Sequence, residues 1–318
     1  MAYVDVFNGD ADGICALQQL RLAEPRTATL VTGVKRDIAL LGRVDAAAGD
    51  LITVLDISLD KNRPDLLALL GRGARVAYFD HHYPGEIPRH DGLDVHIETL
   101  PDKGTSLLVD DYLEGRYRAW AVVGTFGDNF DAAAHRAAAA LDLDERQRGA
   151  LRELGICLNY NSYGARIEDL HFPPNDLYRR LAPYPDPLAF VAGDETFAAL
   201  QEGYAQDMAK VSALRPEVET DTHGLYVLPD DRWARRVSGV FANELAQAAP
   251  QRAHALLTRL GGGFLVSVRA PLVRPEGADV LCRQFPTGGG RKAAAGINEL
   301  SDSAYDDFVE RFLAAFQS

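Results

Sequence analysis

Aspartate, asparagine and histidine residues gather at points of the sequence where an apolar run ends. These points are Asn8-Gly9-Asp10-Ala11-Asp12-Gly13, then Asp56, then Asp80-His81-His82. Carboxylate and amide oxygens and imidazole nitrogens are groups that bind divalent cations in proteins. The pattern therefore predicts a cation site, although each point taken alone is also typical of a hydrogen-bonded turn.

The apolar runs before these residues have the length and composition of β-strands. We expect strands at 2–7, 28–34, 51–56, 74–79 and 95–97, and helices at 14–20, 37–48 and 62–70. Strands and helices that alternate at this spacing indicate a parallel sheet flanked by helices. Because parallel strands end at the same edge of a sheet, Asp56 and Asp80 would lie together there. A further apolar run, 119–129, is interpreted as a strand that brings Asp128 to the same edge.

The first of these motifs joins a predicted strand to a predicted helix. Alternate residues of an extended chain share one face, so Asn8, Asp10 and Asp12 would point into one site. Gly9 and Gly13 would permit the sharp turn between strand and helix.

Two other polar segments precede the end of this region. Asn161 and Arg166 lie in an aromatic and polar stretch, 158–166, that could equally address a phosphate or form an ordinary loop. Thr105 or Ser106 is expected to be the N-cap of a helix over 105–113.

A proline-rich stretch, 172–187, and a predicted helix over 196–214 divide the chain in two. We expect an N-terminal domain at 1–190, a helical linker at 191–216 and a smaller C-terminal α/β domain at 217–318. The second domain is predicted to contain strands at 225–228 and 264–269 and helices at 238–249, 279–285 and 304–316.

Three consecutive glycines, Gly288, Gly289 and Gly290, precede Arg291 and Lys292 in the second domain. Backbone N–H groups of glycines can turn toward an anion, and the two cationic side chains add charge at the same place. We expect an anion site here, with a flexible connector as the alternative.

Composition limits the class of protein. Of the 318 residues, 47% are hydrophobic and 25% charged, as is typical of a soluble globular protein. The net charge is −13, and residues 1–214 carry 21 Lys and Arg against 33 Asp and Glu, which disfavours binding a long nucleic acid. Three dispersed cysteines, with no signal peptide or membrane span in the pattern, predict a cytoplasmic protein.

Together the motifs resemble the DHH phosphoesterase family with its DHH-associated C-terminal domain, over nearly the whole chain. The family's D-x-D-G motif is matched by Asp10-Ala11-Asp12-Gly13, its second motif by Asp56, its third by Asp80-His81-His82 and its fourth by Asp128. The glycine-rich signature of the associated domain is matched by Gly288-Gly289-Gly290-Arg291-Lys292-Ala293-Ala294-Ala295-Gly296, where one extra alanine shifts the frame.

The resemblance implies a metal-binding catalytic domain, a substrate-binding second domain and two divalent cations, usually Mn²⁺, with Mg²⁺ or Co²⁺ as alternatives. Asn8, Asp10 and Asp56 would hold one ion, and Asp12, Asp56, His81 and Asp128 the other, with Asp56 bridging. Two ions about 3.5–4 Å apart clamp the attacking and leaving oxygens and activate a bridging water as the nucleophile. Asp80 would orient a histidine, and His82 would contact the scissile phosphate or protonate the leaving group.

Two residues depart from the family pattern. Asn8 stands where many members carry His and RecJ-like members tend to carry Asp, and an amide is a neutral, weaker ligand. Arg291 stands where the associated domain often has His, but a guanidinium still binds an anion bidentately. Arg269 resembles the arginine with which members bind the distal end of a substrate. The segment around Arg166 loosely resembles an Asn…Gly-Arg segment of RecJ-like members.

RecJ-like nucleases carry an oligonucleotide-binding domain for which we expect no room after the glycine-rich segment. The chain instead resembles the nanoRNase/oligoribonuclease and pAp-phosphatase branch, which implies a phosphoesterase acting on short oligonucleotides or nucleotide phosphates. The alternatives are an inorganic pyrophosphatase or exopolyphosphatase, and a non-catalytic nucleotide sensor, which Asn8 favours. The expected partner is a short oligonucleotide or small phosphorylated substrate, not a long duplex nucleic acid or a membrane. The sequence is compatible with a homodimer.

Overall fold

The computed structural model describes residues 1–317. The chain forms two compact units, residues 1–202 and residues 203–318, and each is described by itself. Helix α9 (Glu195–Val211) crosses the boundary between them and corresponds to the helix predicted over 196–214. No helix among residues 1–317 combines the length and the apolar character needed to span a bilayer.

The first unit contains a parallel five-stranded sheet in the order β2-β1-β3-β4-β5. Its strands are β1 (Tyr3–Phe7), β2 (Thr29–Thr32), β3 (Leu51–Leu55), β4 (Arg75–Asp80) and β5 (Leu93–Ile97). The parallel sheet expected from the alternation of strands and helices is therefore confirmed. Each strand enters at one edge and leaves at the other, so all five carboxyl ends lie along one edge.

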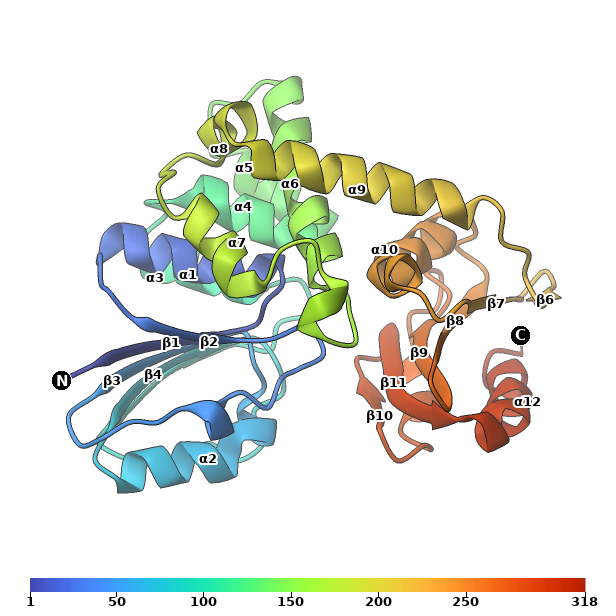
Figure 1. The fold of residues 1–318 in the computed structure, drawn as a ribbon, viewed down its shortest axis with the longest axis horizontal. Helices are drawn as coiled ribbons and strands as arrows, with labels where there is room; N and C mark the ends of the chain where they lie inside the picture. The colour runs from blue at the N-terminus through green and yellow to red at the C-terminus, as the bar shows by residue number, and fades with distance from the viewer. Residues whose placement is uncertain (318) are drawn as a thin grey trace. The chain divides into compact units, whose positions relative to one another are not determined.

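Helices cover both faces of this sheet because its strands are apolar on both sides (Figure 1). The helices of the unit are α1 (Ala11–Ala23), α2 (Leu59–Gly71), α3 (Thr105–Tyr112), α4 (Arg118–Gly127), α5 (Asp131–Ala138), α6 (Glu145–Ser162), α7 (Pro174–Leu181) and α8 (Pro187–Gly193). Phe7, Leu55 and Phe79 point into a core with α1 and α4. Val54 and Tyr78 point into a second core, which includes residues of α2.

Two elements of the first unit differ from the sequence prediction. The run 119–129 is not a strand but the greater part of helix α4, and Asp128 is its C-cap. Trp120 to Gly127 are all buried, so no polar face was present to reveal the helical period. The helix predicted at 37–48 is reduced to a 3₁₀ turn, Leu41–Arg43, since the buried Asn62 amide binds this backbone at Ile38 O (2.6 Å) and Leu41 N (3.1 Å).

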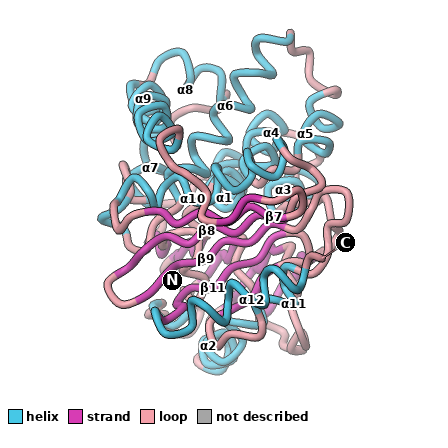
Figure 2. The backbone as a smooth tube through the Cα atoms, turned by 90° about the vertical axis from the view of Figure 1, so that its right-hand side faces the viewer, coloured by secondary structure: helices cyan, strands magenta, loops and turns pink. Residues whose placement is uncertain are grey.

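The second unit contains a mixed six-stranded sheet in the order β10-β11-β9-β8-β7-β6. Its strands are β6 (Val218–Glu219), β7 (His223–Leu228), β8 (Ala253–Leu260), β9 (Gly263–Arg269), β10 (Gly288–Gly290) and β11 (Ala294–Ser301). Its helices are α10 (Arg232–Ala248), α11 (Ala278–Cys282) and α12 (Tyr305–Ala315). Alternate residues of β8 and β9 face a core with α11 and α12, and Figure 2 shows α10 on the other side of the strands.

Sequence patterning missed part of this second sheet. Strand β8 was not predicted, and α10 begins at Arg232 rather than at 238. The glycine-rich segment, expected to bind an anion or to be a flexible connector, forms β10 and pairs antiparallel with β11. Glycine is required at 288, where a Cβ would lie 1.7 Å from Cys282 O. Close backbone approach therefore explains this glycine without any ligand.

Candidate metal centre

The carboxyl edge of the first sheet brings the polar strand-end residues together. Asn8 and Asp10 follow β1, Asp56 follows β3, and Asp80 ends β4 just before His81 and His82. Asp56 adopts a left-handed backbone (φ 59°), a conformation that aspartate tolerates better than most residues. The strand thus turns at once, and its carboxylate stays at the edge, 1% exposed.

Asp12 lies inside helix α1 rather than on extended chain, so the alternation predicted for Asn8, Asp10 and Asp12 does not hold. Helix α1 begins at Ala11, and Asp10 is its N-cap, with Oδ1 accepting from the N–H of Gly13 (3.0 Å). Asp12 is carried into the site by the first turn of the helix and is fully buried.

The Asp12 carboxylate also caps helix α3 from across the unit. Its Oδ2 accepts from the N–H of Thr105 (2.6 Å), and its Oδ1 accepts from the N–H of Ser106 (2.8 Å) and from the Ser106 hydroxyl. The N-cap position itself is Gly104, so the prediction of Thr105 or Ser106 was wrong. A Cβ at Gly104 would lie 2.7 Å from Asp12 Oδ2, which explains why no side chain occupies that place.

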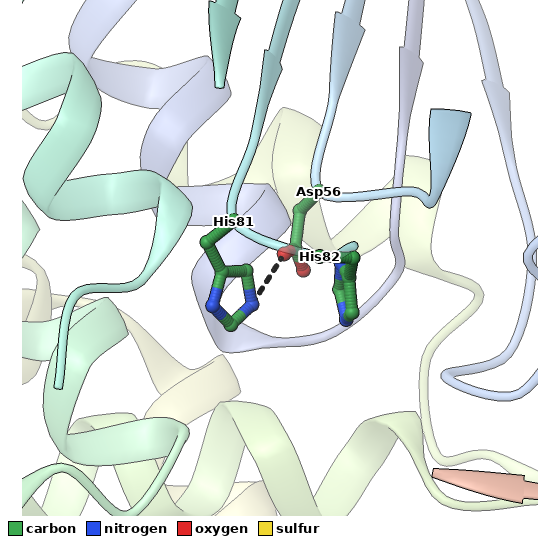
Figure 3. A group of neighbouring side chains, drawn as sticks. All are labelled: Asp56, His81 and His82. Carbon is green, nitrogen blue, oxygen red and sulfur yellow. Dashed lines mark ion pairs between the residues drawn. The ribbon is translucent and has the colours of Figure 1, made fainter. Parts of the chain in front are cut away.

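His81 faces these carboxylates with its ring nitrogen Nε2. This atom lies 3.4 Å from Asp56 Oδ1, 3.8 Å from Asp128 Oδ2 and 4.0 Å from Asp12 Oδ2, and the first of these contacts is drawn in Figure 3. It is buried and has no hydrogen-bond partner among residues 1–317. Two ligands of one cation at about 2.1 Å lie about 3 to 4 Å apart, which is the spacing found here. The residues present therefore fit a divalent cation.

The electrostatics of the cluster also favour a bound cation. Burial, together with the neighbouring Asp128 carboxylate, raises the pKa of Asp12. Burial and the charges of Asp10 and Asp12 raise the pKa of Asp56 well above its usual range. Crowded carboxylates of this kind repel one another, and a divalent cation relieves that repulsion.

His82 is oriented by Asp80. Its Nδ1 lies 2.7 Å from Asp80 Oδ1, and the Asp80 side chain is fully buried. Burial alone would lower the pKa of His82, but the Asp80 carboxylate outweighs burial and raises it. Because Nδ1 is engaged, Nε2 is the nitrogen of His82 left to act on a substrate.

Lys35, a residue outside the predicted site, belongs to the same cluster. It follows β2, and its Nζ donates to Asp10 Oδ2, to Asp128 Oδ1 (2.8 Å) and to Asn159 Oδ1 of α6 (3.0 Å). Burial would lower the pKa of Lys35, but Asp10 and Asp128 hold it well above the ordinary value. The signal was present, because Lys35 is the first charged residue after a strand, as Asp56 is.

Three further residues were predicted to bind an ion or a phosphate in the first unit: Asn161, Arg166 and Asn8. Asn161 is buried, and its amide binds the backbone of His171 and Phe172, so it braces a loop rather than facing a phosphate. Arg166 is exposed at the start of a 3₁₀ turn, Ile167–Asp169. Asn8 donates from Nδ2 to Lys35 O (3.3 Å), and its buried Oδ1 has no hydrogen-bond partner among residues 1–317.

In the second unit, Arg269 is half-buried and donates from Nε to Asn243 Oδ1 of α10 (2.7 Å). Gly288, Gly289 and Gly290 form β10, and Arg291 and Lys292 are exposed in the turn between β10 and β11. Their roles toward a substrate remain predictions.

Comparison with known proteins identifies the fold. No protein-family model matches the sequence, and no curated protein does so either. A DHH-domain protein described as a member of a family of ribosomal proteins is similar with a TM-score of 0.64 and 15% identity, over 98% of this chain and 86% of its own. An exonuclease RecJ bound to manganese has a TM-score of 0.62 and 19% identity, over 98% and 89% of the two chains. The pGpG-specific phosphodiesterase PggH of Vibrio cholerae has a TM-score of 0.55 and 14% identity, over 99% and 100%. The chain therefore has the α/β fold of the DHH-domain proteins.

Proposed function

We propose that this protein is a metal-dependent phosphoesterase of the DHH type that hydrolyses short oligonucleotides or nucleotide phosphates. The observation that carries the proposal is the group formed by the buried Asp12 and His81 and the half-buried Asp128, whose ligand atoms lie within 4.8 Å of one another. Asp56, His81 and His82 form a second such group around the same imidazole. A divalent cation held there would polarise a phosphoryl oxygen and lower the pKa of a water molecule.

His82 and Thr105 have further roles in the proposed reaction. His82, oriented by Asp80 and about one-third exposed, is placed to donate a proton from Nε2 to the leaving oxygen. The raised pKa of His82 favours the protonated form that this role requires. Thr105 supports Asp56 by donating from Oγ1 to Asp56 Oδ1 (3.0 Å), so the carboxylate keeps its orientation.

Two further facts support a small phosphorylated substrate. Solved structures with this fold include an exonuclease bound to manganese and a phosphodiesterase specific for the dinucleotide pGpG. The acidic balance of the chain, with net charge −13, disfavours long nucleic acids, which are bound mainly through Lys and Arg. We propose Mn²⁺ as the working ion, with Mg²⁺ and Co²⁺ as alternatives.

A substrate panel tests this proposal. The purified protein would be incubated with pApA, pGpG, pAp, pyrophosphate and polyphosphate, each with Mn²⁺, Mg²⁺ or Co²⁺, and the products would be separated by ion-exchange chromatography. We expect metal-dependent hydrolysis of a dinucleotide or of pAp, and its loss in Asp12→Asn. Hydrolysis of pyrophosphate or polyphosphate alone would show that the proposed substrate class is wrong. Nucleotide binding without any hydrolysis would refute the proposal that the protein is an enzyme.

A further inference from the structure

Lys35 occupies the side of the cluster where the family resemblance places the first of two cations. An ammonium group has three donors, and three side-chain oxygens accept from this one: Asp10 Oδ2, Asp128 Oδ1 and Asn159 Oδ1. The lysine side chain is 23% exposed, so its position is set by the unit and not by solvent.

Asp10, the only charged residue predicted to hold the first ion alone, is paired with a cationic side chain. Both oxygens of Asp10 are used, Oδ1 by the N–H of Gly13 and Oδ2 by Lys35. Asn8 contributes no charge, and its amide nitrogen donates to the backbone oxygen of Lys35. A cation within about 2.1 Å of Asp10 Oδ2 and Asp128 Oδ1 would overlap the ammonium group and be repelled by it. This side of the cluster does not fit a second divalent cation.

Asp128 connects the two sides of the cluster. Its Oδ1 accepts from Lys35 at 2.8 Å, and its Oδ2 lies 3.8 Å from His81 Nε2. One carboxylate thus presents one oxygen to a fixed positive charge and the other to the group that fits a cation. This is the arrangement expected of a carboxylate shared between two positive centres, one of which belongs to the chain.

We propose that the Lys35 ammonium takes the place of one of the two cations, so that this chain holds a single divalent cation, at Asp12, Asp56, His81 and Asp128. The inference rests on the proposed function for the identity of the centre, but concerns how many ions it holds. Lysine binds phosphate as a point charge, so Lys35 is also placed to neutralise a substrate oxygen on its side of the centre.

Metal stoichiometry tests the inference without measuring catalysis. The full chain would be stripped with EDTA, dialysed against Mn²⁺ and assayed for bound metal by mass spectrometry, with electron paramagnetic resonance on the same samples. We expect one Mn²⁺ per chain and the spectrum of an isolated ion. Two ions per chain with an exchange-coupled spectrum would overturn the inference and leave the proposed function intact. No bound ion would overturn the proposed function, and the inference with it.

Substitution of the lysine provides a second measurement. Lys35→Met combined with Asn8→Asp removes the ammonium and restores a charged ligand, and should raise the stoichiometry from one Mn²⁺ to two and produce a coupled spectrum. Lys103→Met is the matched control, because Lys103 is similarly buried (18% exposed) but pairs with Glu98 and Asp111 instead. It should keep one ion. If the double variant is folded by circular dichroism and still binds one ion, Lys35 is not what excludes the second.

Discussion

Replacing Asp56 by asparagine should stabilise the metal-free protein and remove its stabilisation by Mn²⁺. The Asp56 carboxyl is 1% exposed, and burial together with Asp10 and Asp12 raises its pKa well above the usual range. Ionising it at pH 8 therefore costs folding free energy. Asparagine has nearly the same shape, tolerates the left-handed backbone and keeps an oxygen for the hydrogen bond from Thr105.

The size of the effect follows from the charges around this carboxylate. Two like charges 4 Å apart repel by about 4 kcal/mol at an effective dielectric constant near 20. His82 offsets part of this repulsion, so we expect a net gain of about 2 kcal/mol for the variant without metal. In a unit of 202 residues, that gain raises Tm by about 4–8 °C. Mn²⁺ at 100 times its Kd should add about 2.7 kcal/mol to the native protein and little to the variant.

Thermal unfolding at pH 8, in EDTA and in saturating Mn²⁺, measures both effects. The variant should unfold at the higher temperature in EDTA and at the lower temperature in Mn²⁺. Asp94→Asn is the control, because it removes the same charge from an exposed side chain (70%) on strand β5 of the same sheet. It should shift neither Tm appreciably. A lower Tm for Asp56→Asn in EDTA, or an unchanged response to Mn²⁺, would refute the reasoning.

Three further outcomes are expected. Asp80→Asn should lower kcat by about 10²-fold or more. It should also move the alkaline limb of the pH–rate profile to lower pH, because Asp80 raises the pKa of His82. An unchanged alkaline limb would show that His82 is not the proton donor. Gly104→Ala should weaken Mn²⁺ binding measured by titration calorimetry, since the new Cβ would lie 2.7 Å from the Asp12 carboxylate. Gly71→Ala is the control and should leave Mn²⁺ binding unchanged, because its Cβ would meet no other atom within 4 Å. Burial lowers the pKa of His254 to about 4, so this imidazole is protonated at higher pH in the unfolded chain than in the folded chain. The free energy of unfolding, measured in urea, should therefore fall as the pH drops from about 6.5 toward 4, by at most about 1.4 kcal/mol per pH unit. His254→Leu should reduce this dependence on pH.

Sequence patterning located the sheet and its edge because strand ends carry a local signal. An apolar run followed at once by Asp56 or by Asp80-His81-His82 is visible in the chain itself, and parallel strands bring such ends together. The run that precedes Asp128 was assigned to the wrong element because it is buried on every side, and a helix buried all round has no polar stripe.

Contacts between distant segments explain the rest of what the sequence did not show. The capping of α3 by Asp12 joins residues more than 90 positions apart, and no local motif records it. The three acceptors of Lys35 likewise come from β1–α1, α4 and α6, which only the packed unit brings together. Lys35 was visible as a strand-end charge, but the expectation of carboxylates and imidazoles gave no reason to choose a lysine.

Asp12 both faces the candidate cation and caps helix α3, which limits how this centre can be re-engineered. Any attempt to change its ion preference by lengthening or replacing that side chain would also unseat the first turn of a neighbouring helix. Selectivity would be altered at less structural cost through His81, whose inward nitrogen makes no hydrogen bond within residues 1–317. A mutational library aimed at new metals should therefore hold position 12 fixed and vary position 81.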